Sequence, residues 1–536
     1  MRKTASKWTA AALAFGLLLA GCSSGGNTPS GAAGEKADTG KPKDFVMGIA
    51  ADAVTLDPSL QSDLVSITIT SEIYETLVRY KAGSSELESD LATSWEASPD
   101  GLSWTFHLAK DVKFHDGTPF NADAFIFNFE RWWDEKNPYH KGDFSPFQAD
   151  FGGFKDSETC VVKDVQKIDD DTVQINLKQP FSPLLAILSQ TEYGIASPEA
   201  IKKHNGDILK TPVGTGAFKF VSWTPGDKIV LEKNQDYRQP GMPKLDKLIF
   251  QVIKDNTARL NALRAGQIDL MDGLSPSDAA SVKSDAKLQL YETPSNNVGY
   301  LAMNNLKPPF DNPKVRQAIN MAIDKQALID AYYYGLAEPA VTVLPSKNWA
   351  FHTDLNDYEV NVEKAKELLK EAGYPNGFST ELWAMPVARP YMPQPEQIAT
   401  VLQADLKKIG IDAKIVTMDW ATYTQKMKNG EHTMGLMGWA PGTWDPSNLL
   451  YTLLHSSNAK PPALNLSFYK NPQVDTLLEN ALKETDQTKA AELYKQAQQI
   501  IHDDAPMVPL VHTKPVLAGA SYVKDFVPSP VGTPQF

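Results

Sequence analysis

Cysteine is nearly absent from this chain of 536 residues, which contains only Cys22 and Cys160. Cys22 belongs to the N-terminal segment, so the rest of the chain has one cysteine and no intramolecular disulfide is expected in it. Cys160 lies in a strand-like run of small and β-branched residues, which predicts a buried side chain rather than a reactive thiol. The folded body must therefore be stabilised by packing, for which 42% hydrophobic and 10% aromatic residues are sufficient.

Positive charge is also scarce. Lysine and arginine number 52 against 65 acidic residues, which gives a net charge of −13. Loss of an N-terminal leader carrying Arg2, Lys3 and Lys7 would leave a mature chain of −16. Nucleic acid requires a basic surface, so a nucleic-acid partner is not expected. The same charge argues against electrostatic docking on anionic lipid.

Long apolar runs are missing except at the N-terminus. A basic start at Met1–Lys3 precedes an apolar stretch over 10–20, and Leu19–Cys22 follows. This order predicts a signal peptide over residues 1–21, because the apolar stretch is shorter than the ~20 residues of a membrane span. Cys22 resembles the lipid-attachment cysteine of a bacterial lipobox; the alternative is an ordinary secretory signal.

Residues 22–43 are rich in Gly, Ser and Ala, which predicts a flexible linker. An extracytoplasmic protein anchored to the cell membrane by lipid on Cys22 is expected.

Sequence signatures of enzymes are missing too. Outside the N-terminal segment 1–43, the chain has no HExxH, GxSxG, GxxxxGK[ST] or CxxC motif, and its nine histidines show no metal-ligand spacing. The short Gly214–Gly216 run lacks the third glycine of a dinucleotide loop and indicates a turn. We therefore expect neither catalysis nor a bound metal or cofactor.

Strand and helix patterns alternate along the body, which indicates an α/β fold with mixed sheets. Alternating hydrophobicity predicts strands, and a period of about 3.6 residues predicts helices. The predicted strands are 45–50, 102–108, 173–177 and 411–417. The predicted helices are 67–78, 122–133, a pair starting at Pro313 and Asp324, 362–372, 397–409 and one stretch over 477–503.

Several motifs together resemble one family. They span nearly the whole body in a fixed order: Thr55–Pro58, Ile73–Val78, Leu91–Trp95, Lys113–Ala122, Asn137–Lys141, Pro212–Gly216, Asn297–Leu301, Lys314–Ala318, and Leu382–Val387 with Arg389–Tyr391. The chain resembles the extracytoplasmic solute-binding proteins, family 5, that serve peptide and nickel ABC importers, and most of all the dipeptide-binding members.

The resemblance implies two lobes joined by a hinge, with an extra domain inserted in the first lobe. The first lobe is expected over 44–79 and 211–296, with a C-terminal return over 505–536. The inserted domain is expected over 80–210 and the second lobe over 297–504.

The resemblance also implies ligand-binding residues. Arg389 matches the arginine that binds the ligand carboxylate in that family. A guanidinium suits this role because two of its N–H groups can donate hydrogen bonds to the two carboxylate oxygens. Gly442 stands where the dipeptide binders carry an aspartate for the ammonium group. Either Asp445 or a water takes over that role, or the ligand has no α-amino group at this place.

Aromatic residues near these loops complete the candidate set. Trp383, Trp439 and Trp444 flank the loops, where they either form the walls of the ligand site or pack in the core. Tyr139 is a further candidate from the inserted domain, together with His140, although Asn-Pro-Tyr is also typical of a turn.

The expected function is capture of a short peptide or a peptide-like anion by a monomeric receptor. The receptor would deliver the ligand to the permease subunits of an ABC importer. The alternatives are a metal chelate, haem or a glutathione-like solute on the same fold, or a receptor that signals rather than transports.

Overall fold

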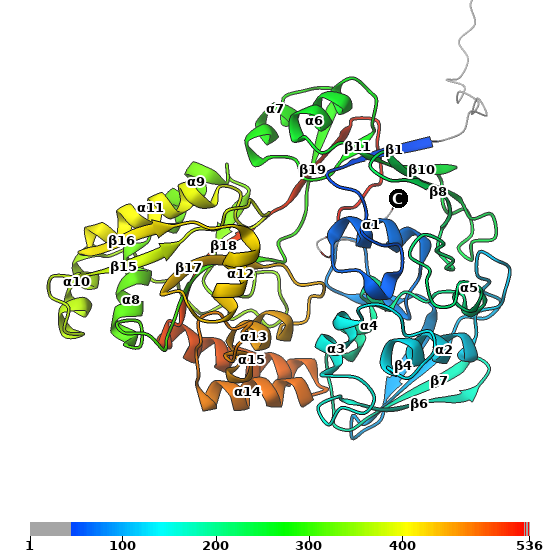
Figure 1. Cartoon of the computed structure of the whole chain (residues 1–536), viewed down its shortest axis with the longest axis horizontal. Helices are drawn as coiled ribbons and strands as arrows, with labels where there is room; N and C mark the ends of the chain where they lie inside the picture. The colour runs from blue at the N-terminus through cyan, green and yellow to red at the C-terminus, as the bar shows by residue number, and fades with distance from the viewer. Residues whose placement is uncertain (1–43, 530, 532–533, 535) are drawn as a thin grey trace, which may run out of the picture. The chain divides into compact units, whose positions relative to one another are not determined.

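The computed structural model describes residues 44–529, 531, 534 and 536 (Figure 1). The expected signal peptide, Cys22 and the linker 22–43 lie outside the described residues. Within the described part of the chain, no helix combines the length and apolarity needed to cross a bilayer. Cys160 is buried there as a free cysteine, as expected.

The first large sheet has seven strands in the order β12-β19-β11-β1-β10-β9-β8. β1 runs parallel to β10 and β11, whereas the other pairs are antiparallel, so the sheet is mixed. Its strands are β1 (Asp44–Ile49), β8 (Phe218–Thr224), β9 (Lys228–Lys233), β10 (Lys247–Val252), β11 (Leu270–Met271), β12 (Leu288–Glu292) and β19 (Val516–Ala520). The helices near this sheet are α1 (Leu64–Ile73), α6 (Asn256–Arg264) and α7 (Ala279–Lys283), with 3₁₀ turns η1 (Pro58–Leu60) and η3 (Pro276–Asp278).

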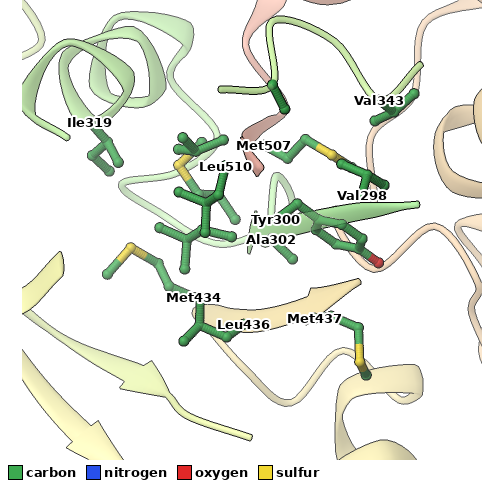
Figure 2. Close-up of a cluster of buried hydrophobic side chains, with 14 of the residues drawn as sticks. Val298, Tyr300, Ala302, Ile319, Val343, Met434, Leu436, Met437, Met507 and Leu510 are labelled. Atoms are coloured by element: carbon green, nitrogen blue, oxygen red, sulfur yellow. The ribbon is translucent and has the colours of Figure 1, made fainter. Parts of the chain in front are cut away.

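The second large sheet has six strands in the order β14-β18-β13-β17-β15-β16. They are β13 (Val298–Met303), β14 (Ala337–Pro339), β15 (Phe378–Trp383), β16 (Ile411–Val416), β17 (Met434–Trp439) and β18 (Met507–Thr513). Every residue of β13 is buried, as expected for a central strand covered on both faces. Figure 2 shows its Tyr300 and Ala302 beside Met434 and Leu436 of β17 in this core.

Helices surround the second sheet. They are α8 (Pro313–Ala322), α9 (Lys325–Tyr332), α10 (Val362–Glu371), α11 (Pro395–Lys408), α12 (Trp420–Lys428), α13 (Ser447–Leu454), α14 (Pro472–Lys483) and α15 (Gln487–Asp504), with the 3₁₀ turn η4 (Ser456–Asn458).

A third, four-stranded antiparallel sheet has the order β4-β5-β7-β6, and a small hairpin β2-β3 accompanies it. The elements are β2 (Val78–Tyr80), β3 (Leu87–Ser89), β4 (Ala92–Ala97), β5 (Ser103–Leu108), β6 (Val162–Asp169), β7 (Thr172–Leu177), α2 (Ala122–Trp133), α3 (Ser145–Phe151), α4 (Leu184–Leu188), α5 (Pro198–Lys203) and the 3₁₀ turn η2 (Thr191–Tyr193). Its core is aromatic, with edge-to-face contacts of Phe129 to Phe147 and Phe151. It falls within the segment expected as the inserted domain.

Two short connections link the two large sheets. Residues 293–297 lead from β12 to β13, and residues 514–515 lead from β18 to β19. The two connections are bonded to each other, since the Thr293 N–H donates to the Pro515 carbonyl at 2.8 Å. The return to the first sheet was expected from residue 505, but β18 pairs with β13 and β14 of the second sheet, so the chain rejoins the first sheet only at β19. The other domain boundaries stay predictions.

Helix ends explain where sequence patterns succeeded and where they failed. The predicted helix 122–133 is confirmed as α2, which Asn121 caps by accepting the Ala124 N–H. The single stretch predicted over 477–503 is wrong: Glu484 is extended and Asp486 caps a new helix by accepting the Thr488 and Lys489 N–H groups. The helix predicted to Val78 ends at Ile73, because Tyr74 is extended and the chain then enters β2.

Candidate ligand site

The loops that follow β15 and β17 carry most of the predicted site residues. The two strands run parallel, with Leu382 opposite Met434 and Trp383 opposite Gly435. Parallel strands end at the same edge of a sheet, so the segments that follow them emerge together. Tyr391 joins the two segments: a Cβ added at Gly438 would collide with its ring. The topology thus brings Arg389 to the same edge as the loop 440–446.

Arg389 is exposed at the tip of a tight turn. Its N–H donates to the Met392 carbonyl at 3.0 Å, and the Met392 N–H donates back at 2.8 Å. Its guanidinium carbon lies 5.1 Å from the centroid of the Trp420 ring, a cation–π contact. Among the residues that the structure describes, no carboxylate lies within ion-pair distance of this guanidinium. A positioned cation without an acidic partner is suited to bind an anionic group.

Aromatic rings continue behind Arg389. Trp420 stacks on Tyr423 with centroids 5.8 Å apart, and Tyr423 lies 6.2 Å from Trp383. Trp383 is only 5% exposed, and its Nε1 donates to Glu381 at 2.9 Å. Trp383 therefore packs in the core beneath the site and supports Trp420 through Tyr423.

Asp445 is hydrogen-bonded to the start of the helix that follows it. Its Oδ1 accepts hydrogen bonds from the Ser447 N–H at 2.9 Å and the Ser447 hydroxyl at 2.5 Å. Burial raises the pKa of this carboxyl, and the two Ser447 bonds oppose the rise. Its hydrogen bonds go to the start of α13, so Asp445 has a structural role there.

The two tryptophans of the same segment are also held by protein groups. Trp439 is half-buried, and its Nε1 donates to Asn448 at 2.9 Å. Trp444 is buried; its N–H donates to the Tyr80 hydroxyl at 2.9 Å, and its carbonyl accepts from Asn348 at 3.0 Å. The bond to Tyr80 ties this loop to β2. Asn296, in the first inter-sheet connection, donates to the Pro441 and Thr443 carbonyls at 3.3 and 3.0 Å and fixes the same loop from the other side.

Gly442 is exposed, and the side chain of Gln190 fills the space beside it. A Cβ built on Gly442 would lie 2.6 Å from Gln190 Oε1. Tyr139, by contrast, is placed by contacts remote from these loops: its ring lies 5.5 Å from Phe127, and its carbonyl accepts from Arg131 at 3.0 Å. The structure does not bring Tyr139 to Arg389 or Gly442.

Sequence reasoning missed three residues that the structure places at this site. Trp420 follows Asp419, which caps α12, so a helix-start signal was available, but nothing in the sequence indicates that the ring meets Arg389. Tyr80, in β2, and Gln190, before η2, are far from the loop in the chain and reach it only through tertiary packing. Within the described residues no group of three or more His, Cys, Asp or Glu is arranged to hold a metal.

Comparison with known proteins places this architecture in a family. The model of the bacterial extracellular solute-binding proteins, family 5, matches residues 86–461. Heme-binding protein A of Haemophilus influenzae is 39% identical over 97% of this chain and 96% of its own length. The dipeptide-binding protein of Escherichia coli is 36% identical over 93% and 92%. The periplasmic binding protein DppA of Helicobacter pylori, solved in complex with the peptide STSA, has a TM-score of 0.76 and 36% identity over 91% of this chain and 96% of that one. The chain belongs to the family 5 bacterial extracellular solute-binding proteins.

Proposed function

We propose that the chain is the receptor of an ABC importer and captures a short peptide. The observation that carries this proposal is the exposed guanidinium of Arg389, which is held over Trp420 without an acidic partner among the described residues. A peptide carboxylate supplies the missing anion, and a guanidinium keeps its charge when a ligand encloses it. The E. coli relative is a dipeptide-binding protein and the H. pylori relative was solved with a bound peptide, which supports the same choice.

Such a receptor captures its ligand by shifting from an open to a closed arrangement of its two lobes. The inter-sheet connections 293–297 and 514–515 are the only short links between the two large sheets among the described residues, so they are the natural hinge. A ligand that contacts both sides favours the closed arrangement. The closed protein then delivers the ligand to the permease, without catalysis.

Binding to purified protein tests the role of Arg389. We expect Arg389→Ala to weaken binding of alanyl-alanine or of the tetrapeptide STSA by about 1–3 kcal/mol, since the carboxylate loses a charged hydrogen-bond partner. Isothermal titration calorimetry measures the change. Arg264→Ala, at an arginine in α6 that bonds Ser281, is the matched control.

The control variant should bind as the wild type does. Equal peptide affinity of wild type and Arg389→Ala would contradict the assignment. Binding of hemin or glutathione in preference to both peptides would instead favour the second candidate function, for which the 39% identical heme-binding relative is the reason.

The proposal extends to the location of the protein. We infer that Cys22 receives lipid and anchors the receptor outside the cytoplasmic membrane, and that residues 22–43 act as its tether. The order of basic start, apolar stretch and Leu19–Cys22 supports this.

A further inference from the structure

Gln190 occupies the space that a side chain at position 442 would need. Gln190 precedes η2, in the segment expected as the inserted domain, whereas Gly442 lies in the loop after β17. A Cβ at position 442 would approach Gln190 Oε1 to 2.6 Å, closer than two such atoms come in proteins. With Gln190 in this position, residue 442 therefore has no room for a side chain, and the amide group that takes the space comes from another part of the fold.

A carboxylate fixes the orientation of this amide. Gln190 Nε2 donates to Asp150 Oδ2 at 2.9 Å, and the Tyr193 hydroxyl donates to the same oxygen at 2.7 Å. An ionised carboxylate only accepts hydrogen bonds, so the NH₂ group must face Asp150 and the carbonyl oxygen must face Gly442. The side chain can swing aside only by giving up its bond to Asp150, and bonds to charged groups are among the stronger ones.

Two carboxyls lie on the Gln190 side of this contact: Asp150 accepts the Gln190 amide, and Glu192 follows two residues along the chain. Burial raises the pKa of Asp150 to about 6. Burial also raises the pKa of Glu192 to about 7, with a further contribution from the charge of Asp150. Within the described residues neither carboxyl forms an ion pair with lysine, arginine or histidine. At neutral pH Asp150 is ionised behind the amide, and this negative charge favours a cationic donor at Gln190 Oε1.

Asp445, the acid of the same loop, has its Oδ1 occupied by both Ser447 bonds at the start of α13. The acceptor nearest to Gly442 is thus Gln190 Oε1, which has no hydrogen-bond partner of its own among the described residues.

We propose that Gln190, oriented by Asp150, accepts a hydrogen bond from the ammonium group of the bound peptide in place of a side chain on the 440–446 loop. This inference rests on the proposed function and adds a specificity-determining residue to it. Arg389 on the second-sheet side then binds the carboxylate end, and the inserted domain binds the amino end. Recognition of both ends requires both parts of the protein.

Calorimetry with alanyl-alanine and N-acetyl-alanyl-alanine tests the contact. Gln190→Met keeps the length of the side chain but removes the acceptor, so we expect binding of the free-amine peptide to weaken roughly tenfold or more. Binding of the acetylated peptide should change little. Gln174→Met, at a glutamine of β7 that donates to Thr105, is the matched control.

The outcomes separate the two proposals. If the wild type binds the free-amine peptide and Gln190→Met binds it equally well, the role of Gln190 is wrong and the peptide function stands. If the wild type binds neither this dipeptide nor STSA, both proposals are wrong.

A second pair of variants tests the steric match. Gly442→Asp should weaken binding of alanyl-alanine while Gln190 is present, because the new side chain displaces the amide. In the Gln190→Ala background the same substitution should restore binding at least tenfold, because the carboxylate then has room. Stronger binding by Gly442→Asp with Gln190 in place would overturn the inference, and melting temperatures report whether each variant is folded.

Discussion

At the scale of single residues, charged groups in this protein differ by what surrounds them. Arg389 remains exposed over Trp420, ready for an anion, whereas Arg131 is fully buried and paired with Asp57 at 2.5 Å. Burying an ion pair removes both charges from water, so the Arg131–Asp57 pair is a structural element rather than a ligand site. Exposure and the absence of a partner, which a sequence does not display, distinguish the two arginines.

Glu72 gives a prediction at this scale. Its side chain is 6% exposed in α1, and burial raises its pKa to about 8, a rise that Arg79 opposes. The folded protein therefore keeps a proton on Glu72 that the unfolded chain releases near pH 4.5, so this group lowers the free energy of unfolding as pH rises from about 4.5 to 8. We expect Glu72→Gln to gain roughly 2–4 kcal/mol relative to wild type between pH 5 and pH 8.

Urea unfolding at the two pH values measures this gain. The exposed Glu96→Gln, in β4, is the control and should show no comparable change. A stability difference between Glu72→Gln and wild type that is the same at both pH values would contradict the prediction.

At the scale of elements, short polar side chains determine where helices begin. Asn121, Asn312, Asn471 and Asp486 each accept backbone N–H groups at the start of a helix, and Pro313 and Pro472 occupy the first helical position after two of them. Such local signals can be recognised in the sequence. The break between α14 and α15 was missed although the segment 483–489 has no apolar residue and contains the capping residue Asp486.

Asp486→Ala tests whether Asp486 caps the start of α15 or lies inside one continuous helix. Loss of a cap that accepts the Thr488 and Lys489 N–H groups should lower the free energy of unfolding by about 1 kcal/mol. In one continuous helix the same substitution would stabilise instead, because alanine is the better helix former. Thermal and urea unfolding decide between the signs, with Gln487→Ala as the control.

At the scale of the whole molecule, the site depends on contacts between segments from different sheets. Tyr80 of β2 accepts the Trp444 N–H, and the Ser182 N–H near α4 donates to the Leu482 carbonyl of α14 at 2.7 Å. Asn296 connects one inter-sheet link to the loop that contains Gly442. A change in the relative position of the sheets would therefore alter the loop that the ligand contacts.

The proposed membrane attachment depends on Cys22, which lies outside the described residues. We expect Cys22→Ser to release the protein from the membrane fraction of expressing cells, because serine cannot receive the proposed thioether-linked lipid. Detergent phase partitioning and mass spectrometry of the mature N-terminus measure this. Cys160→Ser is the control, and an unmodified mature chain that begins elsewhere would contradict the lipid assignment.

Much of the fold could be predicted because its signals are local. Strand alternation, helix caps and the ordered motifs indicated mixed α/β architecture and the family, and they singled out Arg389 and Gly442. The predicted aromatic wall was less accurate: Trp383 lies in the core, and the structure does not bring Tyr139 to the loops. Burial depends on which surfaces pack together, so a local pattern cannot assign it.

The sequence by itself determined the alternation of strands and helices, the helix starts, the family, and the presence of glycine at position 442. Only the tertiary structure decided what occupies that place. Gln190 and Gly442 are far apart in the chain and meet because the segments that carry Tyr80 and Gln190 pack against the loop after β17. Hydrogen bonds and steric contacts act over a few ångströms in space, whereas sequence patterns report neighbours along the chain.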